Sequence, residues 1–110
     1  MIIDYQQIEE QLVEKFKGGE GHMGTRGVAA DGQKIMLNRL TPGSSIGYHC
    51  HERNTEIMYI LSGHGYYDMD GKREEIHAGQ VHYCPLGHSH AMYNDGDEDL
   101  VFFAVVTMEV

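Results

Sequence analysis

The sequence predicts an all-β protein, a sandwich or closed barrel of short strands, with one short α-helix in front of it. From residue 25 onward, apolar runs of strand length recur at roughly ten-residue intervals, and no helical periodicity separates them. Glycine-containing turn sequences stand between the runs. A chain of 110 residues is long enough for one domain. We therefore expect residues 1–24 to form the helix and a glycine-rich connector, and residues 25–110 to form the barrel.

Residues 4–17 are expected to form an amphipathic α-helix. Ile8, Leu12 and Phe16 recur every fourth residue, which places them in one apolar stripe along a helix. Asp4 can cap the first turn, and a glycine pair follows the end of the pattern. The stripe should cover the outside of the barrel or a neighbouring subunit.

The glycine-rich connector contains Gly19, Gly21 and Gly24 at the spacing of a dinucleotide-binding loop. That fingerprint follows a strand and opens a helix, whereas here it follows the expected helix and leads into strands. Glu20 would also oppose a pyrophosphate. We therefore interpret this segment as a connector that folds across the barrel mouth, not as a nucleotide site.

Short turn sequences separate the expected strands. Asp70-Gly71, between two such runs, is a strong hairpin signal, because both residue types tolerate positive φ. The turns are Asp31-Gly32, Pro42-Gly43, Asp70-Gly71, Pro85-Leu86-Gly87 and Asn94-Asp95-Gly96. The strands that they help to delimit cover residues 25–30, 33–40, 65–69, 72–76 and, as a buried final strand, 100–108.

The charge and the cysteines restrict the partners and the compartment. A formal net charge of −9 repels nucleic acid and anionic membrane surfaces, so we expect neither as a partner. Cys50 and Cys84 are too few for a secreted disulfide scaffold and are expected to be reduced thiols. The first residues do not resemble a signal peptide, and no apolar run reaches bilayer length. We expect a cytoplasmic protein.

His49 and His51 are the first candidate metal ligands. Residues two apart in a strand point to the same face, with Cα atoms about 6.5–7 Å apart, a span that two imidazoles can close onto one ion. Tyr48, Cys50 and Glu52 would then point to the other face. Cys50 is therefore not expected to be a ligand, although it stands between the histidines.

Glu56 is the candidate carboxylate ligand. It follows a short polar stretch and has the same parity as Met58 and Ile60, which we expect to point inward. An ionised carboxylate that faces a barrel interior is costly unless it is paired or bound to metal. The alternative is a surface glutamate that begins a strand.

A further imidazole ligand can come from His82, His88 or His90. His88 directly follows a turn and is expected to be exposed. His90 begins a strand and shares a face with Met92, whereas the pattern does not fix the facing of His82. The residues alone leave this choice open.

Inward-facing side chains from several strands are expected to line a pocket beside the histidines. On the strand over residues 33–40 we place Asn38 inward, because the opposite choice would bury Arg39 without a partner. The predicted pocket residues are Asn38, Met36, Met58, Ile60, Met92 and Phe102. Plain core packing is an equal alternative for the apolar members.

Two segments resemble the two conserved motifs of the cupin family. The first has Gly43, His49, His51, Glu56 and Gly63 at the family's spacing, and the second has Gly79, Pro85, Gly87, His90 and Asn94. The resemblance implies a double-stranded β-helix, or jelly-roll barrel, and selects His90 over His82 and His88 as the fourth ligand. It is strongest to small stand-alone oxalate-decarboxylase-like cupins, which implies a homodimer with the N-terminal segments packed on the partner.

Three imidazoles and one carboxylate suit a divalent transition metal. This ligand set favours Mn, Fe, Ni, Co or Zn over Ca or Mg, and the absence of thiolates argues against a purely structural zinc site. Four protein ligands leave open coordination positions. We expect one such ion per chain, and the ligands do not specify which.

The expected function is the binding of a small oxygen-rich molecule, a carboxylate or an enol, at this ion. Two classes of function remain. One is an enzyme that decarboxylates, oxygenates or isomerises the molecule. The other is a non-catalytic, metal-dependent binding or sensing domain. The assigned interior has no second carboxylate and no inward arginine, which argues against oxalate decarboxylase activity itself.

Overall fold

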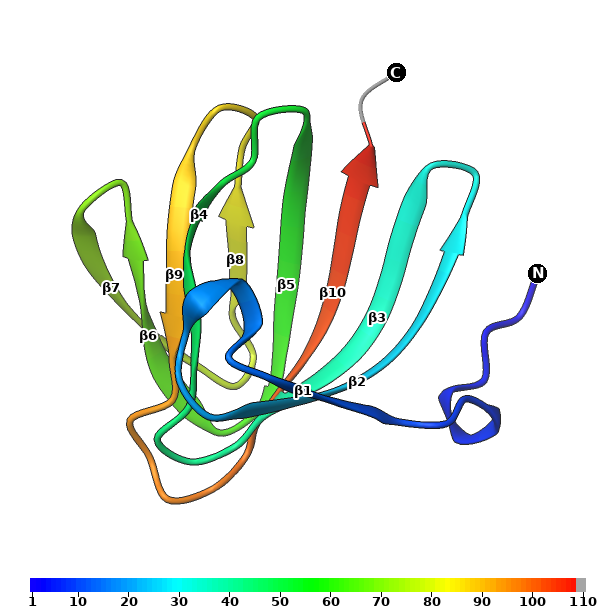
Figure 1. Ribbon diagram of the computed structural model, residues 1–110, viewed down its shortest axis with the longest axis horizontal. Coiled ribbons are helices and arrows are strands. Elements are labelled where there is room, and N and C mark those ends of the chain that lie inside the picture. Colours follow the sequence, from blue (N-terminus) through cyan, green and yellow to red (C-terminus); the bar gives the residue numbers. More distant parts are fainter. Residues whose placement is uncertain (109–110) are drawn as a thin grey trace.

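The computed structural model describes residues 1–108, which form two antiparallel β-sheets wrapped into one jelly-roll barrel (Figure 1). The six-stranded sheet has the order β1-β2-β3-β10-β5-β8, and the four-stranded sheet has the order β4-β9-β6-β7. The strands are β1 (Gln11–Glu14), β2 (His22–Ala30), β3 (Gln33–Leu40), β4 (Ser45–Cys50), β5 (Asn54–Ser62), β6 (His64–Met69), β7 (Lys72–His77), β8 (Val81–Cys84), β9 (Ser89–Tyr93) and β10 (Leu100–Met108). The predicted all-β class and jelly-roll architecture are confirmed.

The α-helix predicted over residues 4–17 is wrong. Two short 3₁₀ turns, η1 (Tyr5–Gln7) and η2 (Phe16–Gly18), flank strand β1 in its place. Strand β1 pairs with β2 along its whole length, and this sheet pairing outweighs the weak helical preference of an isolated short segment. Leu12, from the expected stripe, is 60% exposed. Asp4 does act as a cap, but it caps η1 by accepting a hydrogen bond from the Gln6 backbone N–H.

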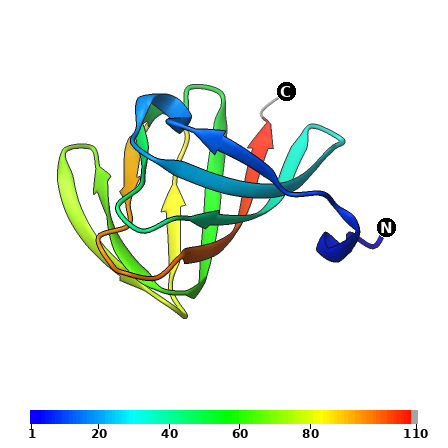
Figure 2. The ribbon, with the colours of Figure 1, turned by 60° about the horizontal axis from the view of Figure 1, so that its bottom comes forward.

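The connector after η2 lies against strand β4, as Figures 1 and 2 both show. Gly19 and Gly47 make this close approach possible, because a Cβ atom on either one would collide with the backbone of the other segment. Ser45 Oγ holds the Glu20 backbone N–H at 2.9 Å. Strand β2 begins at His22, so the end of the expected connector is already part of the six-stranded sheet.

The predicted hairpin at Asp70-Gly71 and the predicted turn at Asp31-Gly32 are confirmed. Asp31-Gly32 joins β2 to β3, and Asp70-Gly71 joins β6 to β7. All four residues have positive φ, between 51° and 84°, as a two-residue type I′ turn requires. The predicted final strand over residues 100–108 is β10, which lies between β3 and β5 in the six-stranded sheet.

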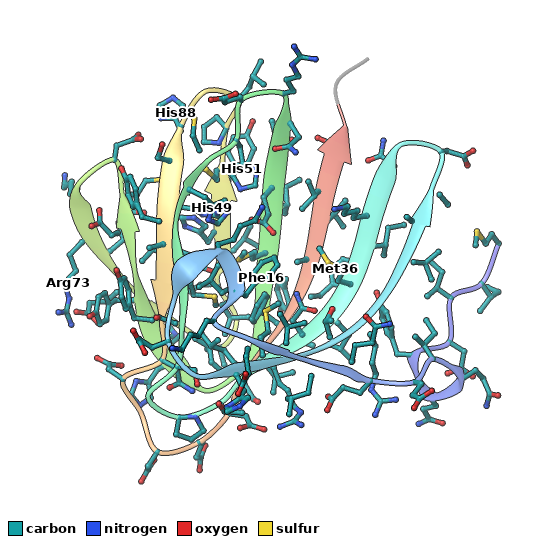
Figure 3. The ribbon with its side chains drawn as sticks, in the orientation of Figure 1. Phe16, Met36, His49, His51, Arg73 and His88 are labelled. Atoms are coloured by element: carbon teal, nitrogen blue, oxygen red, sulfur yellow. The ribbon has the colours of Figure 1, made fainter. Side chains whose placement is uncertain are left out.

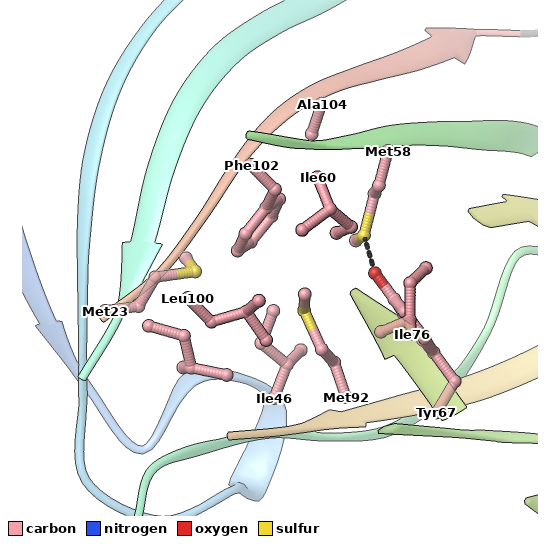
Figure 4. Packing of buried hydrophobic residues seen from close by; sticks show 11 residues of the cluster. Met23, Ile46, Met58, Ile60, Tyr67, Ile76, Met92, Leu100, Phe102 and Ala104 are labelled. Carbon is pink, nitrogen blue, oxygen red and sulfur yellow. Dashed lines mark hydrogen bonds between the residues drawn. The ribbon is translucent and has the colours of Figure 1, made fainter. Parts of the chain in front are cut away.

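The apolar core fills the space between the two sheets (Figure 4). Its residues are Met23, Leu40, Ile46, Met58, Ile60, Tyr67, Ile76, Met92, Leu100, Phe102 and Ala104. The buried Tyr67 hydroxyl donates to Met58 Sδ at 2.8 Å, which joins the two sheets inside the core. Among residues 1–108, no helix is long and apolar enough to cross a membrane.

The predicted facing of β3 is confirmed. Asn38 and Leu40 are buried, whereas Arg39 lies on the outer face. The Arg39 guanidinium donates to both carboxylate oxygens of Glu10, at 2.6 and 2.8 Å, and also contacts Asp99 at 3.3 Å. This bridge fastens the N-terminal segment to the six-stranded sheet.

Candidate metal centre

Four side chains meet inside the barrel, and they are the four that the sequence predicts as metal ligands: His49, His51, Glu56 and His90. The Nε2 atoms of the three histidines lie 2.9–3.2 Å apart in every pair. Glu56 Oε1 lies 3.2 Å from His51 Nε2 and 3.1 Å from His90 Nε2. All four ligand atoms lie within 4.8 Å of one another. Figure 3 shows His49 and His51 inside the barrel, near Phe16.

These separations fit one transition metal ion. Two ligand atoms that bind an ion at about 2.1 Å and at right angles are themselves about 3.0 Å apart. Three imidazole nitrogens so close together cannot all be satisfied by one another, because a neutral pair of facing lone pairs repels. A cation at the centre would accept all three lone pairs and the carboxylate oxygen at once.

Both sheets contribute to this centre. His49 is on β4 and is directly opposite His90 of β9 in the four-stranded sheet. The pairing of these strands is irregular between Ile46 and His49, where the bulge adjusts the direction of the histidine. Glu56 comes from β5 in the six-stranded sheet. The candidate centre therefore joins the two layers of the barrel.

The remaining ring nitrogen, Nδ1, of each histidine has a hydrogen-bond partner outside the cluster. The partners are the Gly47 carbonyl oxygen for His49 at 2.7 Å, the Asn54 side-chain oxygen for His51, and His82 Nε2 for His90 at 2.9 Å. A proton on Nδ1 satisfies each contact and leaves Nε2 with a free lone pair. Each ring is thus fixed in orientation, and in its neutral form it has the tautomer that a metal requires.

The electrostatics of the centre favour an ionised carboxylate. Burial raises the pKa of Glu56, but the hydrogen bonds from His51 and His90 outweigh this effect and hold the pKa at about 2. The hydrogen bond with Glu56 raises the pKa of His51, whereas burial lowers the pKa of His49. Glu56 is therefore charged at neutral pH, as a metal ligand must be.

The cysteines and the alternate residues of β4 lie outside the cluster. Tyr48, Cys50 and Glu52 are all exposed, as the strand alternation predicts. Both cysteines are free. Burial raises the pKa of Cys84 to about 12, so this residue is a neutral thiol and not a thiolate ligand.

The two other candidate histidines differ from each other. His88 is exposed in the loop between β8 and β9 and pairs with Asp70 (Figure 3). His82 is 5% exposed and points inward, behind His90. In the structure, the alternation along β8 points His82 inward. All four residues of β8 are apolar, aromatic or histidine, so the sequence pattern could not show which of them face inward. Asn54 was missed for a different reason, because it lies in a polar stretch that reads as a turn.

A cavity of about 390 Å³ opens onto the cluster. Of the predicted pocket residues, Asn38, Met36, Met58 and Phe102 line it. Ile60 and Met92 do not line it and belong to the apolar core, the alternative that the sequence left open. The Asn38 amide oxygen is buried and has no hydrogen-bond partner among the described residues.

Three cations also line this cavity, namely Lys17, Lys34 and Arg53. They are three of only eight lysines and arginines in a chain with a net charge of −9. Lys17 is presented by η2, and both Lys17 and Lys15, the residue before η2, have left-handed backbone angles, φ 56° and 48°. Cys50 and Glu52, although exposed, contribute to the rim.

A jelly-roll barrel with three imidazoles and one carboxylate converging on its interior defines a small β-barrel with a candidate transition-metal centre. Residues 36–106 match the family model of the cupin domain. The chain therefore belongs to the cupin family, as the two sequence motifs indicate.

Relatives of similar length extend this assignment. The chain is 33% identical to an oxalate-binding protein of Thermotoga maritima, over 98% of this chain and 94% of the relative. It also matches a crystal structure from Thermotoga maritima, described as a predicted oxalate decarboxylase, with a TM-score of 0.92 and 32% identity over 98% of this chain and 99% of the other. A cupin barrel protein of Salinispora arenicola shares the fold, with a TM-score of 0.72 and 23% identity over 97% and 86% of the two chains.

Proposed function

We propose that the protein holds one divalent transition metal ion, Mn, Fe, Ni, Co or Zn, at His49, His51, Glu56 and His90, and that it binds a small carboxylate-bearing molecule at this ion. The convergence of three Nε2 atoms and one carboxylate oxygen within 4.8 Å carries the proposal. It is supported by the name of the Thermotoga maritima relative, an oxalate-binding protein.

The residues of the chain supply the binding geometry. Gly47, Asn54 and His82 orient the three imidazoles, and the ionised Glu56 supplies one negative charge. When bound, the ion supplies a Lewis acid for an oxygen atom of the ligand. Since the imidazoles are neutral as ligands, a divalent ion and one carboxylate leave a net positive charge at the bottom of the cavity.

The cations around the cavity select for an anion. Lys17, Lys34 and Arg53 concentrate positive charge there, although the chain as a whole is acidic. Charge of one sign around a concave site raises the local concentration of the opposite ion. A small mono- or dicarboxylate satisfies both the cations and the open metal positions, and its polar end reaches the unpaired Asn38 amide oxygen through a hydroxyl group or a water molecule.

The proposal is tested by titrating oxalate into protein loaded with Mn²⁺ and into protein treated with chelator. We expect binding only to the loaded protein. Lys17→Ala and Arg53→Ala should each weaken it by about two- to fivefold, the strength of an exposed ion pair, and Lys72→Ala on the distant strand β7 should not. Equal affinity with and without metal would overturn the proposal.

The same site also supports a second candidate function, catalysis. Among residues 1–108, Glu52 is the one carboxylate outside the metal cluster that lines the cavity. A carboxyl group beside the open positions can donate or accept a proton during decarboxylation, oxygenation or isomerisation. Carbon dioxide release from oxalate, lowered in Glu52→Gln at unchanged oxalate affinity, would establish an enzyme. Binding without consumption of the ligand would establish a binding or sensing domain.

We further propose that the protein is a homodimer, and that the outer face of the six-stranded sheet forms the interface. On this face Ile57, Tyr59 and Leu61 of β5 lie beside Val81 and Tyr83 of β8, and each is 41–56% exposed. An apolar patch of neighbouring large side chains on a sheet face is typical of an interaction surface.

A second copy of the chain fits this face better than another partner does. Two molecules with a charge of −9 each repel, and a contact without carboxylates adds least to this repulsion; the five exposed residues of the patch are all uncharged. Strand β8 is also the edge of its sheet, which lets two copies approach around a two-fold axis.

The proposed location is the cytoplasm. Both cysteines are free thiols, and Cys50 is exposed. A reducing compartment preserves exposed thiols in this state. Fractionation of cells that produce the protein would test this location.

A further inference from the structure

His82 lies between the candidate metal centre and the outside of the barrel. It stacks on Tyr67, with ring centroids 3.5 Å apart and planes at 9°. Its Nε2 atom lies 2.9 Å from His90 Nδ1. His82 comes from β8 of one sheet and contacts side chains of β6 and β9 in the other, so the strands hold it in one orientation.

The hydrogen bond between these two histidines links their tautomers. His90 Nε2 faces the cluster, and it can bind a metal only if its proton is on Nδ1. That proton can then be donated only to His82 Nε2, so His82 must carry its own proton on Nδ1. His82 Nδ1 lies 3.9 Å from Glu74 Oε1, the partner that favours a proton at this position.

The outer side of His82 borders a cavity, although the residue is only 5% exposed. A second cavity, of about 350 Å³, lies beyond it and is lined by Tyr67, Glu74, Gln80 and His82. A carboxylate and a space for water thus face His82 Nδ1, whereas its Nε2 faces His90. The two ring nitrogens have different surroundings, and this asymmetry selects one tautomer.

We propose that His82 is a positioning residue that holds His90 in the metal-binding tautomer. The inference rests on the proposed metal centre and assigns a role to a residue behind it. All three Nδ1 partners in the centre, a backbone carbonyl, an amide and a neutral imidazole, are uncharged. They orient the ligands without adding negative charge, which preserves the positive charge that an anionic ligand needs.

Packing is the competing explanation of His82, because its ring fills the space beside Tyr67. Two substitutions separate the explanations. His82→Phe keeps an aromatic ring for the stack but removes the acceptor, and His82→Gln keeps a side-chain oxygen as acceptor but removes the ring. A packing role predicts weaker metal binding in His82→Gln, and a positioning role predicts weaker metal binding in His82→Phe.

The experiment is a competition titration of Zn²⁺ against a chelator in the parent and both variants. We expect His82→Phe to bind Zn²⁺ about 10–100-fold more weakly, as for other residues that orient metal ligands, and His82→Gln to stay within about threefold of the parent. If the parent binds Zn²⁺ and His82→Phe binds it with the same affinity, this inference is overturned but the metal centre is not. A parent that binds no Zn²⁺ would overturn the metal centre, and this inference with it.

Nitrogen-15 NMR of the Zn²⁺-loaded parent tests the inference without any substitution. We expect the His90 and His82 rings both to carry their proton on Nδ1, and the His90 Nδ1 proton to show coupling across the hydrogen bond to His82 Nε2. A proton on His82 Nε2 would overturn the inference even if both variants failed to fold.

Discussion

The Nε2 atoms of His51 and His90 lie 2.9 Å apart, although 39 positions separate these residues in the chain. Backbone hydrogen bonds hold this contact, because the His51 N–H donates to the His88 carbonyl and the Gly87 N–H donates to the His51 carbonyl. Glu56 approaches both nitrogens from the opposite sheet. The barrel thus brings these three groups together by its topology.

Removal of a ligand should remove the metal and its stabilisation. His51→Ala or Glu56→Ala should lose the bound metal and stay folded, because neither residue is part of the apolar core. In the parent, free metal at one hundred times its Kd should add about 2.7 kcal/mol to the free energy of unfolding. Elemental analysis and thermal denaturation measure the two effects.

The matched control for these variants is Cys50→Ser, between the two histidines. Cys50 is exposed and lies outside the cluster, so its replacement should leave the metal content and the metal-induced shift in Tm unchanged. A Cys50→Ser protein without metal, or a Glu56→Ala protein with full occupancy, would refute the ligand assignment.

Metal uptake should release protons near pH 6.5. The hydrogen bond with Glu56 raises the pKa of His51 above its usual value of 6.5, so in the metal-free protein more than half of these rings are protonated at that pH. A metal must displace the proton from Nε2. Calorimetric titration in two buffers with different ionisation enthalpies counts the released protons.

Because the pKa of His51 is raised, proton release on metal binding should depend on pH in one direction. The number of protons released from His51 should fall as the pH rises through its raised pKa, because the ring is then already neutral. The affinity for metal should weaken as the pH falls below 6.5. Identical heats in both buffers at pH 6.5 would show that His51 is not protonated in the metal-free protein, contrary to the hydrogen bond with Glu56.

Asn38→Leu should weaken oxalate binding without lowering the free energy of unfolding. The buried amide oxygen of Asn38 has no partner among the described residues, and such a group costs about 1–3 kcal/mol. Leucine has a similar size, so the variant should be as stable as the parent or more stable, yet bind oxalate more weakly. Urea denaturation and calorimetry measure both. A destabilised variant with unchanged affinity would make Asn38 a structural residue.

Ile57→Glu should convert the proposed homodimer into a monomer. Ile57 lies in the exposed apolar patch on the outer face of the six-stranded sheet, and a carboxylate there adds repulsion between two acidic copies. Light scattering after size-exclusion chromatography gives the mass. Tyr48→Glu is the control, because Tyr48 is 53% exposed but belongs to the four-stranded sheet. A dimer in both variants would place the interface elsewhere.

The parts of the fold that local rules determine could be predicted from the sequence. Asp70-Gly71 requires a tight hairpin whatever surrounds it, and the spacing of His49 and His51 puts both on one face of a strand. The helix over residues 4–17 could not be judged correctly, because its apolar period is real but the pairing of β1 with β2 is a long-range contact.

The roles of residues that depend on contacts with another strand could not be predicted from the sequence either. Strand β8 shows no alternation in its residue types, so the facing of His82 appears only when β8 pairs with β5. Likewise, Ile60 and Phe102 are opposite each other in register, but only Phe102 lines the cavity. Both side chains are fully buried, so neither strand parity nor burial distinguishes them.

The most direct test of the metal centre is anomalous diffraction from crystals of Mn²⁺-loaded protein, measured on both sides of the metal absorption edge. We predict one peak per chain, at bonding distance from Nε2 of His49, His51 and His90 and from a carboxylate oxygen of Glu56. A peak elsewhere, such as beside His88 and Asp70, or no peak in a crystal that contains the metal, would contradict the account.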